Sequence, residues 1–134
     1  FMKILLDTNI VLDFLLQRKP FCDDAKEIFE LIEIGKVNGY LCATSVTTIY
    51  YLISKSVGKL KADSIIKDLL QLFDIADVNK NVLFQSLKNN GSDFEDSVIY
   101  SSAEYFNIDV IITRDKKGFK QSNIDVLQPD IFLE

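Results

Sequence analysis

The chain has 134 residues, of which 48% are hydrophobic, and this length and composition exclude a disordered chain and predict one domain over residues 2–134. The formal net charge is −5, from 15 basic and 20 acidic residues, which argues against binding nucleic acid by overall attraction. Histidine is absent, so imidazole catalysis and the usual zinc sites are excluded, and any catalysis must use carboxylates, lysines, hydroxyls or a metal ion held by oxygen.

The cysteines and the hydrophobic runs predict where the protein works. We expect Cys22 and Cys42 to pack as small hydrophobic side chains rather than to form a disulfide or bind a metal ion. The apolar runs are too short to cross a bilayer, and no signal-peptide pattern is present. These features predict a cytoplasmic protein.

The segment 3–9, Lys-Ile-Leu-Leu-Asp-Thr-Asn, predicts a buried strand that ends at a carboxylate. Its three consecutive apolar residues are typical of a parallel strand that is covered on both faces. Asp7 follows directly, and Thr8 or Asn9 can cap a helix that begins near Ile10. Open α/β sheets bind ligands outside the carboxyl ends of their strands, so Asp7 is a candidate site residue, with a turn aspartate as the alternative.

Helical and strand-like patterns alternate over the next eighty residues. The first helix is apolar nearly all round, as expected of a helix buried partly against a second copy of the chain. The segment 44–54 suits a strand as well as a helix because it is rich in β-branched and aromatic residues, and we favour a helix that breaks near Gly58. The expected helices cover about 10–18, 23–34, 44–54, 61–73 and 79–88, and the expected strands cover 40–43 and 74–78.

A second candidate acid lies at the start of a later helix. The sequence from Ser92 to Glu95 has the capping-box pattern and predicts a helix that runs to about Phe106. Asp96 falls in the first turn of this helix, at the edge of its apolar side, so its carboxylate points inward. Glu95 also lies on the inner side but has a capping role, and the alternative for Asp96 is a partner of the helix dipole.

A third acid follows another apolar strand, which we expect over 109–113. Thr113, Arg114 and Asp115 come at its end, and a last, edge strand over 124–127 precedes a tail from Pro129. Strands that alternate with helices predict an α/β fold with a mainly parallel sheet of four or five strands flanked by helices.

The predicted topology brings the three acids into one crevice. Parallel strands end at the same rim of a sheet, so Asp7 and Asp115 lie together, and Asp96 enters from a neighbouring helix. Crowded carboxylates need a cation, and oxygen ligands alone select Mg²⁺ or Mn²⁺, which activates water for phosphodiester hydrolysis. Lys116 and Lys117, with Arg114, either hold a phosphate backbone or form a solvated face.

Three motifs together resemble the PIN domain, and most closely its short bacterial VapC-like form. They are the segment 3–9, the sequence Asp-Phe-Glu-Asp-Ser-Val-Ile-Tyr-Ser-Ser-Ala over 93–103, and Ile-Ile-Thr-Arg-Asp over 111–115. The resemblance covers essentially the whole chain in order and spacing. It implies a three-layer, Rossmann-like fold and a ribonuclease that depends on Mg²⁺ or Mn²⁺, commonly a homodimer, with a small antitoxin as partner in the toxin forms.

The resemblance also assigns residues. Matched by motif, Asp7, Asp96 and Asp115 are the acids that bind the metal ion and carry out catalysis. We expect supporting roles for Asn9, Thr48, Asp93 and Thr113.

One position departs from the PIN pattern. PIN domains usually carry a glutamate early in the helix after the second strand, where this chain has Thr48. A hydroxyl does not replace the charge of a carboxylate, so either Asp93, Glu95 or a water completes the metal shell, or metal affinity and activity are reduced. An inactive PIN module that binds RNA or a partner protein is therefore the first alternative.

Two phosphoryl-transfer classes are the second alternative. A phosphatase of the haloacid-dehalogenase type expects another aspartate two residues after the first, where this chain has Asn9. A receiver domain expects a lysine directly after a late strand, where this chain has Thr113 followed by Arg114.

Overall fold

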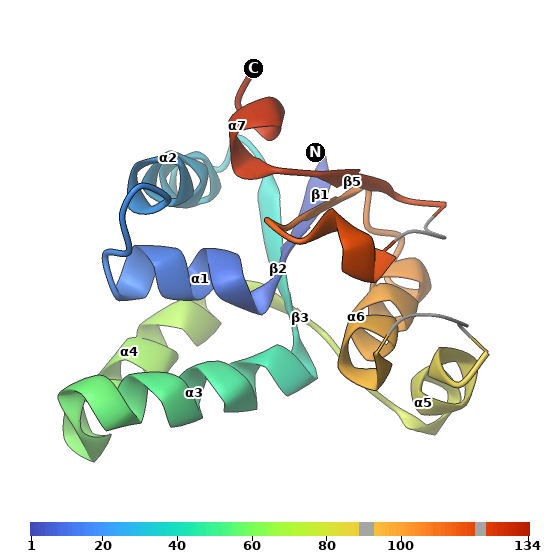
Figure 1. Ribbon diagram of the computed structural model, residues 1–134, viewed down its shortest axis with the longest axis horizontal. Coiled ribbons are helices and arrows are strands. Elements are labelled where there is room, and N and C mark those ends of the chain that lie inside the picture. Colours follow the sequence, from blue (N-terminus) through green and yellow to red (C-terminus); the bar gives the residue numbers. More distant parts are fainter. Residues whose placement is uncertain (89–92, 120–122) are drawn as a thin grey trace.

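A parallel sheet of five strands forms the centre of the computed structural model, which describes residues 1–88, 93–119 and 123–134 (Figure 1). All four strand pairings are parallel, and the spatial order is β3-β2-β1-β4-β5, as the alternation of strands and helices predicts. The strands are β1 (Lys3–Leu6), β2 (Asn38–Cys42), β3 (Asp74–Ala76), β4 (Val110–Ile112) and β5 (Asp125–Leu127).

Helices cover both faces of this sheet, so the fold has the three predicted layers. One core lies between the sheet and the first four helices, and a second core lies beneath α5, α6 and Phe119. Strand β1 contributes Ile4 and Leu6 to the first core and Leu5 to the second, because successive side chains of a strand point to opposite faces. The helices are α1 (Thr8–Leu15), α2 (Cys22–Glu33), α3 (Ala43–Val57), α4 (Lys59–Leu72), α5 (Lys80–Ser86), α6 (Phe94–Tyr105), α7 (Pro129–Phe132) and the 3-10 helix η1 (Lys116–Phe119).

The register of the central strands positions the site. Leu6 pairs with Ile112, so the residues that follow them, Asp7 and Thr113, leave neighbouring strands at the same rim of the sheet. The backbone N–H of Thr113 donates to the carbonyl of Leu127 at 3.0 Å, which holds this rim to β5 as well.

Several predicted boundaries need correction. The helix α1 ends at Leu15, before the expected residue 18, and Pro129 begins a short helix instead of a tail, because proline is favoured in the first helical turn. The ambiguous segment 44–54 is helical, as we expect, and Gly58, with a φ of +86°, separates α3 from α4.

Two further expectations concern the cysteines and the membrane. Cys22 and Cys42 are both buried and free, as predicted. In the described part of the chain, none of the helices has the length and apolar character that a membrane span requires.

Candidate metal centre and active site

Asp7 is held at the end of β1 by three donors. It is the N-cap of α1, a role that we expected of Thr8 or Asn9, and its side chain is only 7% exposed. Its Oδ1 accepts from the backbone N–H of Thr8 at 2.8 Å, and its Oδ2 accepts from the hydroxyl of Thr113 at 2.7 Å. The amide of Asn9 lies 3.5 Å from the same Oδ2. These contacts fix the carboxylate at the rim of the sheet.

Asp96 lies in the first turn of α6 and is half-buried. Asp93 is the N-cap of this helix, and its side chain accepts from the N–H of Asp96 at 2.8 Å; Ser92, which we expected as the cap, lies outside the described residues. Burial raises the pKa of the Asp96 carboxyl to about 7, and the charges of Asp93, Asp7 and Asp115 add to this effect.

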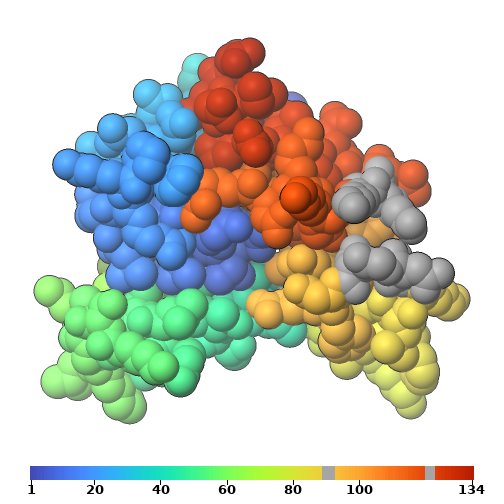
Figure 2. All heavy atoms as spheres, viewed as in Figure 1, coloured from blue at the N-terminus to red at the C-terminus, as the bar shows by residue number. Residues whose placement is uncertain are grey.

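Asp115 follows β4 and is exposed. Its N–H donates to the hydroxyl of Thr113 at 3.0 Å, while its own Oδ1 accepts from the N–H of Lys117 at 3.2 Å. Thr113 thus links two of the predicted acids, since its hydroxyl donates to Asp7 and accepts from Asp115. Figure 2 shows the start of the chain, in blue, beside the orange segment around residue 115 on one face of the molecule.

The electrostatics of the three acids test whether a cation fits. Burial raises the pKa of the Asp7 carboxyl, hydrogen bonds from Thr113 and Thr8 lower it, and the charge of Asp115 raises it again. Each of the three carboxylates is therefore within electrostatic reach of the other two. An oxygen-only set of repelling carboxylates suits a divalent cation.

Two further observations concern this fit. The buried Thr8 Oγ1 and Asn9 Oδ1, next to Asp7, have no hydrogen-bond partner in the described part of the chain, which leaves oxygen atoms available to a metal ion or its water ligands. Within the same described residues, no three acids are yet gathered closely enough to hold a metal ion. A cation bound here would have to draw the carboxylates closer together, and it would relieve their repulsion.

The other predicted site residues differ in their surroundings. Thr48 is half-buried on α3, and its hydroxyl lies 3.5 Å from the carbonyl of Thr44; no hydrogen bond in the described residues joins it to the acids. Lys116 and Lys117 are exposed on η1 and form no ion pair within the described ranges. Their ammonium groups are thus available to a phosphate.

Arg114 contacts two residues, Asp13 and Phe21, that the sequence analysis does not predict as its partners. Its Nε and Nη2 donate to Asp13 at 2.7 and 3.2 Å, and its guanidinium lies 3.9 Å from the centre of the Phe21 ring. Asp13 is only 1% exposed and also accepts from Arg18 at 2.9 Å. The signal was the single charge within the apolar first helix, because a buried acid needs a basic partner. Arg114 therefore holds the loop after β4 to Asp13 of α1 and to Phe21.

Gly118 is a second residue that our sequence interpretation missed. A Cβ atom at this position would overlap the Asp96 carboxylate and lie 2.9 Å from its Cγ. The absence of a side chain here leaves room for Asp96 beneath η1. Only the three-dimensional contact between α6 and η1 reveals this role.

Comparisons with known proteins support the resemblance. Residues 3–117 match the model of the PIN domain. Ribonuclease VapC1 of Aquifex aeolicus is 27% identical over 137 residues, which cover 98% of this chain and 94% of that protein.

Solved structures show the same fold. VapBC2 from Rickettsia felis, bound to a DNA fragment from its promoter, is similar with a TM-score of 0.69 and 19% identity over 93% of this chain and 97% of that chain. VapC20 from Mycobacterium tuberculosis, a toxin that cleaves the sarcin-ricin loop, has a TM-score of 0.69 and 11% identity over 87% of this chain and 93% of its own.

Proposed function

This chain belongs to the PIN domain family, whose model matches residues 3–117, and on that premise we propose that it is a VapC-like endoribonuclease that hydrolyses RNA phosphodiesters. The observation that carries the proposal is the placement of Asp7 and Asp115 after the neighbouring strands β1 and β4, where the Thr113 hydroxyl contacts both residues, with Asp96 within electrostatic reach. The similarity to a ribonuclease over nearly the whole chain supports it. Membership of the family excludes the haloacid-dehalogenase and receiver alternatives.

We propose that Asp7, Asp96 and Asp115 hold Mg²⁺ or Mn²⁺ and are the catalytic acids. When bound, such an ion supplies Lewis-acid polarisation of a phosphoryl oxygen and lowers the pKa of a water molecule. The chain itself contributes the orientation of the ligands. The Thr113 hydroxyl keeps one oxygen of Asp7 turned toward β4, and Asn9 steadies the same oxygen from α1.

Protonation of Asp96 is part of this proposal. In the metal-free protein burial raises the pKa of the Asp96 carboxyl to about 7, so a cation that binds at the three acids would displace the Asp96 proton. Lys116 and Lys117, exposed beside Asp115, are our candidates for contacts with the RNA backbone.

We propose that Asp93 supplies the negative charge of the glutamate that PIN domains usually carry at the position of Thr48. Its charge raises the pKa of both Asp7 and Asp96, so it adds negative potential to the site although it also caps α6. If this charge does not suffice, the chain is the non-cutting module that binds RNA or a partner. Asn also caps helices, so Asp93→Asn removes the charge and keeps the cap.

We further propose a small antitoxin protein as a partner. One of the similar structures is a VapBC assembly. A groove of about 410 Å³ between α1, α2 and α4 offers apolar side chains, among them Phe14, Phe29 and Leu72, that suit one face of a helix. We also propose a homodimer, because large apolar side chains are exposed on α5, at its C-cap and on α6, including Phe84, Leu87 and Phe94.

An RNA-cleavage assay tests the proposed activity. We expect the wild-type protein to cut RNA with Mn²⁺ or Mg²⁺ and to stop when a chelator is added. Asp7→Asn should lose the activity and keep its circular dichroism spectrum, and Asp93→Asn should need a higher metal concentration. Identical RNA products from wild type and Asp7→Asn would refute the cutting activity and favour the non-cutting module.

A further inference from the structure

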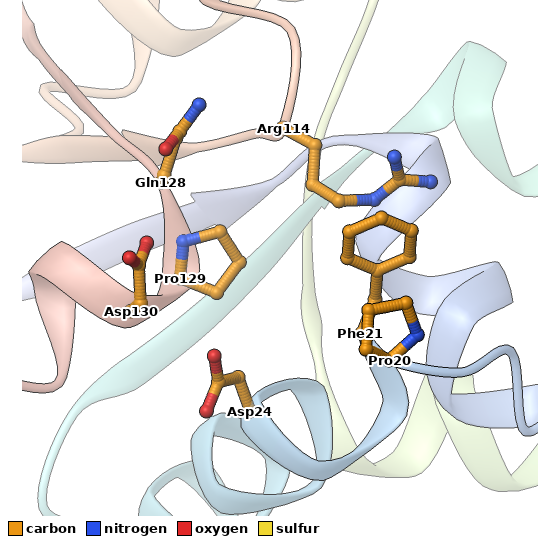
Figure 3. Close-up of a pocket in the computed structure, with 7 residues that line it drawn as sticks. All are labelled: Pro20, Phe21, Asp24, Arg114, Gln128, Pro129 and Asp130. Atoms are coloured by element: carbon orange, nitrogen blue, oxygen red, sulfur yellow. The ribbon is translucent and has the colours of Figure 1, made fainter.

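A cavity opens between the start of α2, Arg114 and the start of α7. It has a volume of about 530 Å³ and is lined by Pro20, Phe21, Asp24, Arg114, Gln128, Pro129 and Asp130. In Figure 3 the rings of Phe21 and Pro129 stand on opposite sides of the opening, and the carboxylate of Asp24 reaches toward the space between them. The exposed Phe21 ring offers a flat surface with polar side chains around it, so the cavity suits a flat ligand.

The charged side chains that line the cavity indicate which class of ligand fits it. Within the described residues, the side chains of Asp24 and Asp130 form neither an ion pair nor a hydrogen bond, so both carboxylates can accept from a ligand. They disfavour a phosphate group inside the cavity itself. Arg114 is held over the Phe21 ring by Asp13 and repels an incoming cation, which disfavours the arginine or lysine of a partner protein.

A neutral, planar ligand with several N–H donors meets all of these conditions. Among the bases of RNA, guanine presents two adjacent donors, N1–H and the N2 amino group, which one carboxylate can accept together. Phe21 is 39% exposed and offers ring surface for stacking, and Gln128 supplies an amide for the remaining polar edge.

We propose that this cavity binds a guanine base of the RNA strand, and this inference rests on the proposed ribonuclease function. Arg114, which lines the cavity, lies between Thr113 and Asp115 in the chain, and Thr113 hydrogen-bonds Asp7. The guanine pocket and the acids thus share one segment. A base in the pocket would fix which phosphodiester reaches the acids.

The affinity of the protein for short RNA oligomers tests the proposed guanine binding directly. Fluorescence anisotropy with the Asp7→Asn protein in Mg²⁺ gives the Kd of oligouridines in which one guanosine is placed at each position in turn, and of the same oligomers with inosine instead. Inosine lacks only the N2 amino group. At one position we expect the guanosine oligomer to bind roughly 10-fold more tightly, the value of a hydrogen bond to a charged acceptor.

Matched variants assign the effect to the pocket. Asp24→Asn or Asp130→Asn should reduce the guanosine-to-inosine ratio to about 1, and Phe21→Ala should weaken binding of the guanosine oligomer. Asp23→Asn, an exposed neighbour in the first turn of α2, should leave the ratio unchanged. The inference is overturned if no position distinguishes guanosine from inosine, if no oligomer binds, or if neither pocket aspartate alters the ratio.

Cleavage separates this inference from the proposed function. RNA cutting without guanosine discrimination refutes the guanine pocket and leaves the ribonuclease intact. If the wild-type protein distinguishes guanosine from inosine but cuts no RNA, the guanine pocket is supported and the chain is a non-cutting module.

Discussion

The hydroxyl of Thr113 donates to Asp7 Oδ2 at 2.7 Å, although the two residues lie 106 positions apart in the chain. The same hydroxyl accepts from the N–H of Asp115 at 3.0 Å. The uncharged Thr113 side chain therefore contacts both acids, Asp7 through its carboxylate and Asp115 through its backbone N–H. These two acids come after the neighbouring strands β1 and β4. This arrangement joins the fold to the proposed chemistry, since the pairing of β1 with β4 brings Thr113 to Asp7.

Thr113→Val should lower activity and shift its dependence on pH. The Thr113 hydrogen bond lowers the pKa of the Asp7 carboxyl, so its loss raises that pKa further and disfavours the charged form. We expect kcat to fall about 10-fold near neutral pH, with a smaller loss at higher pH, and the free energy of unfolding to fall by roughly 1–3 kcal/mol. Thr113→Ser should restore both. An unchanged pH profile in Thr113→Val would contradict this role.

The stability of the metal-free protein should fall as the pH rises from about 4 to 7. The pKa of Asp96 is raised to about 7 in the folded protein, above the ordinary value of 3.8 that it regains on unfolding. Between these values the folded state binds more protons than the unfolded state, so raising the pH destabilises the fold. Urea unfolding in a chelator measures this. The slope should be weaker in Asp96→Asn; an equal slope in both proteins would refute the assignment.

Gly118→Ala should impair activity more than stability. The new Cβ displaces the Asp96 carboxylate, whose far end moves at little energetic cost, so we expect unfolding to change by less than about 1 kcal/mol. A misplacement of this size can reduce kcat/KM by about 100-fold. In an Asp96→Ala background the same substitution should have no effect on stability, because the obstruction is gone. Full activity in Gly118→Ala would contradict the close contact.

The two arginines around Asp13 should compensate for one another. Arg18 and Arg114 both pair with this buried carboxylate, so loss of either leaves one partner in place. We expect Arg18→Ala and Arg114→Ala to cost about 1 kcal/mol each in urea unfolding. The double variant leaves the buried charge unpaired and should cost roughly 3–5 kcal/mol. Additive losses would show that Asp13 does not depend on either arginine.

Much of the fold follows from the sequence because the central strands are locally unambiguous. The apolar runs before Asp7 and Thr113 have no polar alternation, and only a parallel sheet covered on both faces explains them. The sequence predicts the end of α3 from Gly58, because glycine readily adopts the positive φ that this residue has in the structure. The helix at Pro129 was missed because its four residues are too short for a periodic pattern.

The candidate site was less predictable because its contacts span long distances in the chain. The sequence predicts Asp7, Asp96 and Asp115 as site residues from their places at the ends of strands and at the start of a helix, and their roles stay a prediction. The pairing of Asp13 with Arg114 joins residues 101 positions apart, and no local pattern reports such a contact. The room that Gly118 leaves for Asp96 is likewise a property of packing between separate elements.

Anomalous scattering from a crystal of the protein soaked in Mn²⁺ tests the central claim most directly. The account predicts a manganese peak at the rim of the sheet, bound by carboxylate oxygens of Asp7, Asp96 and Asp115, and its loss in Asp7→Asn. No peak there in a fully soaked crystal, or a peak held by other residues, would contradict it.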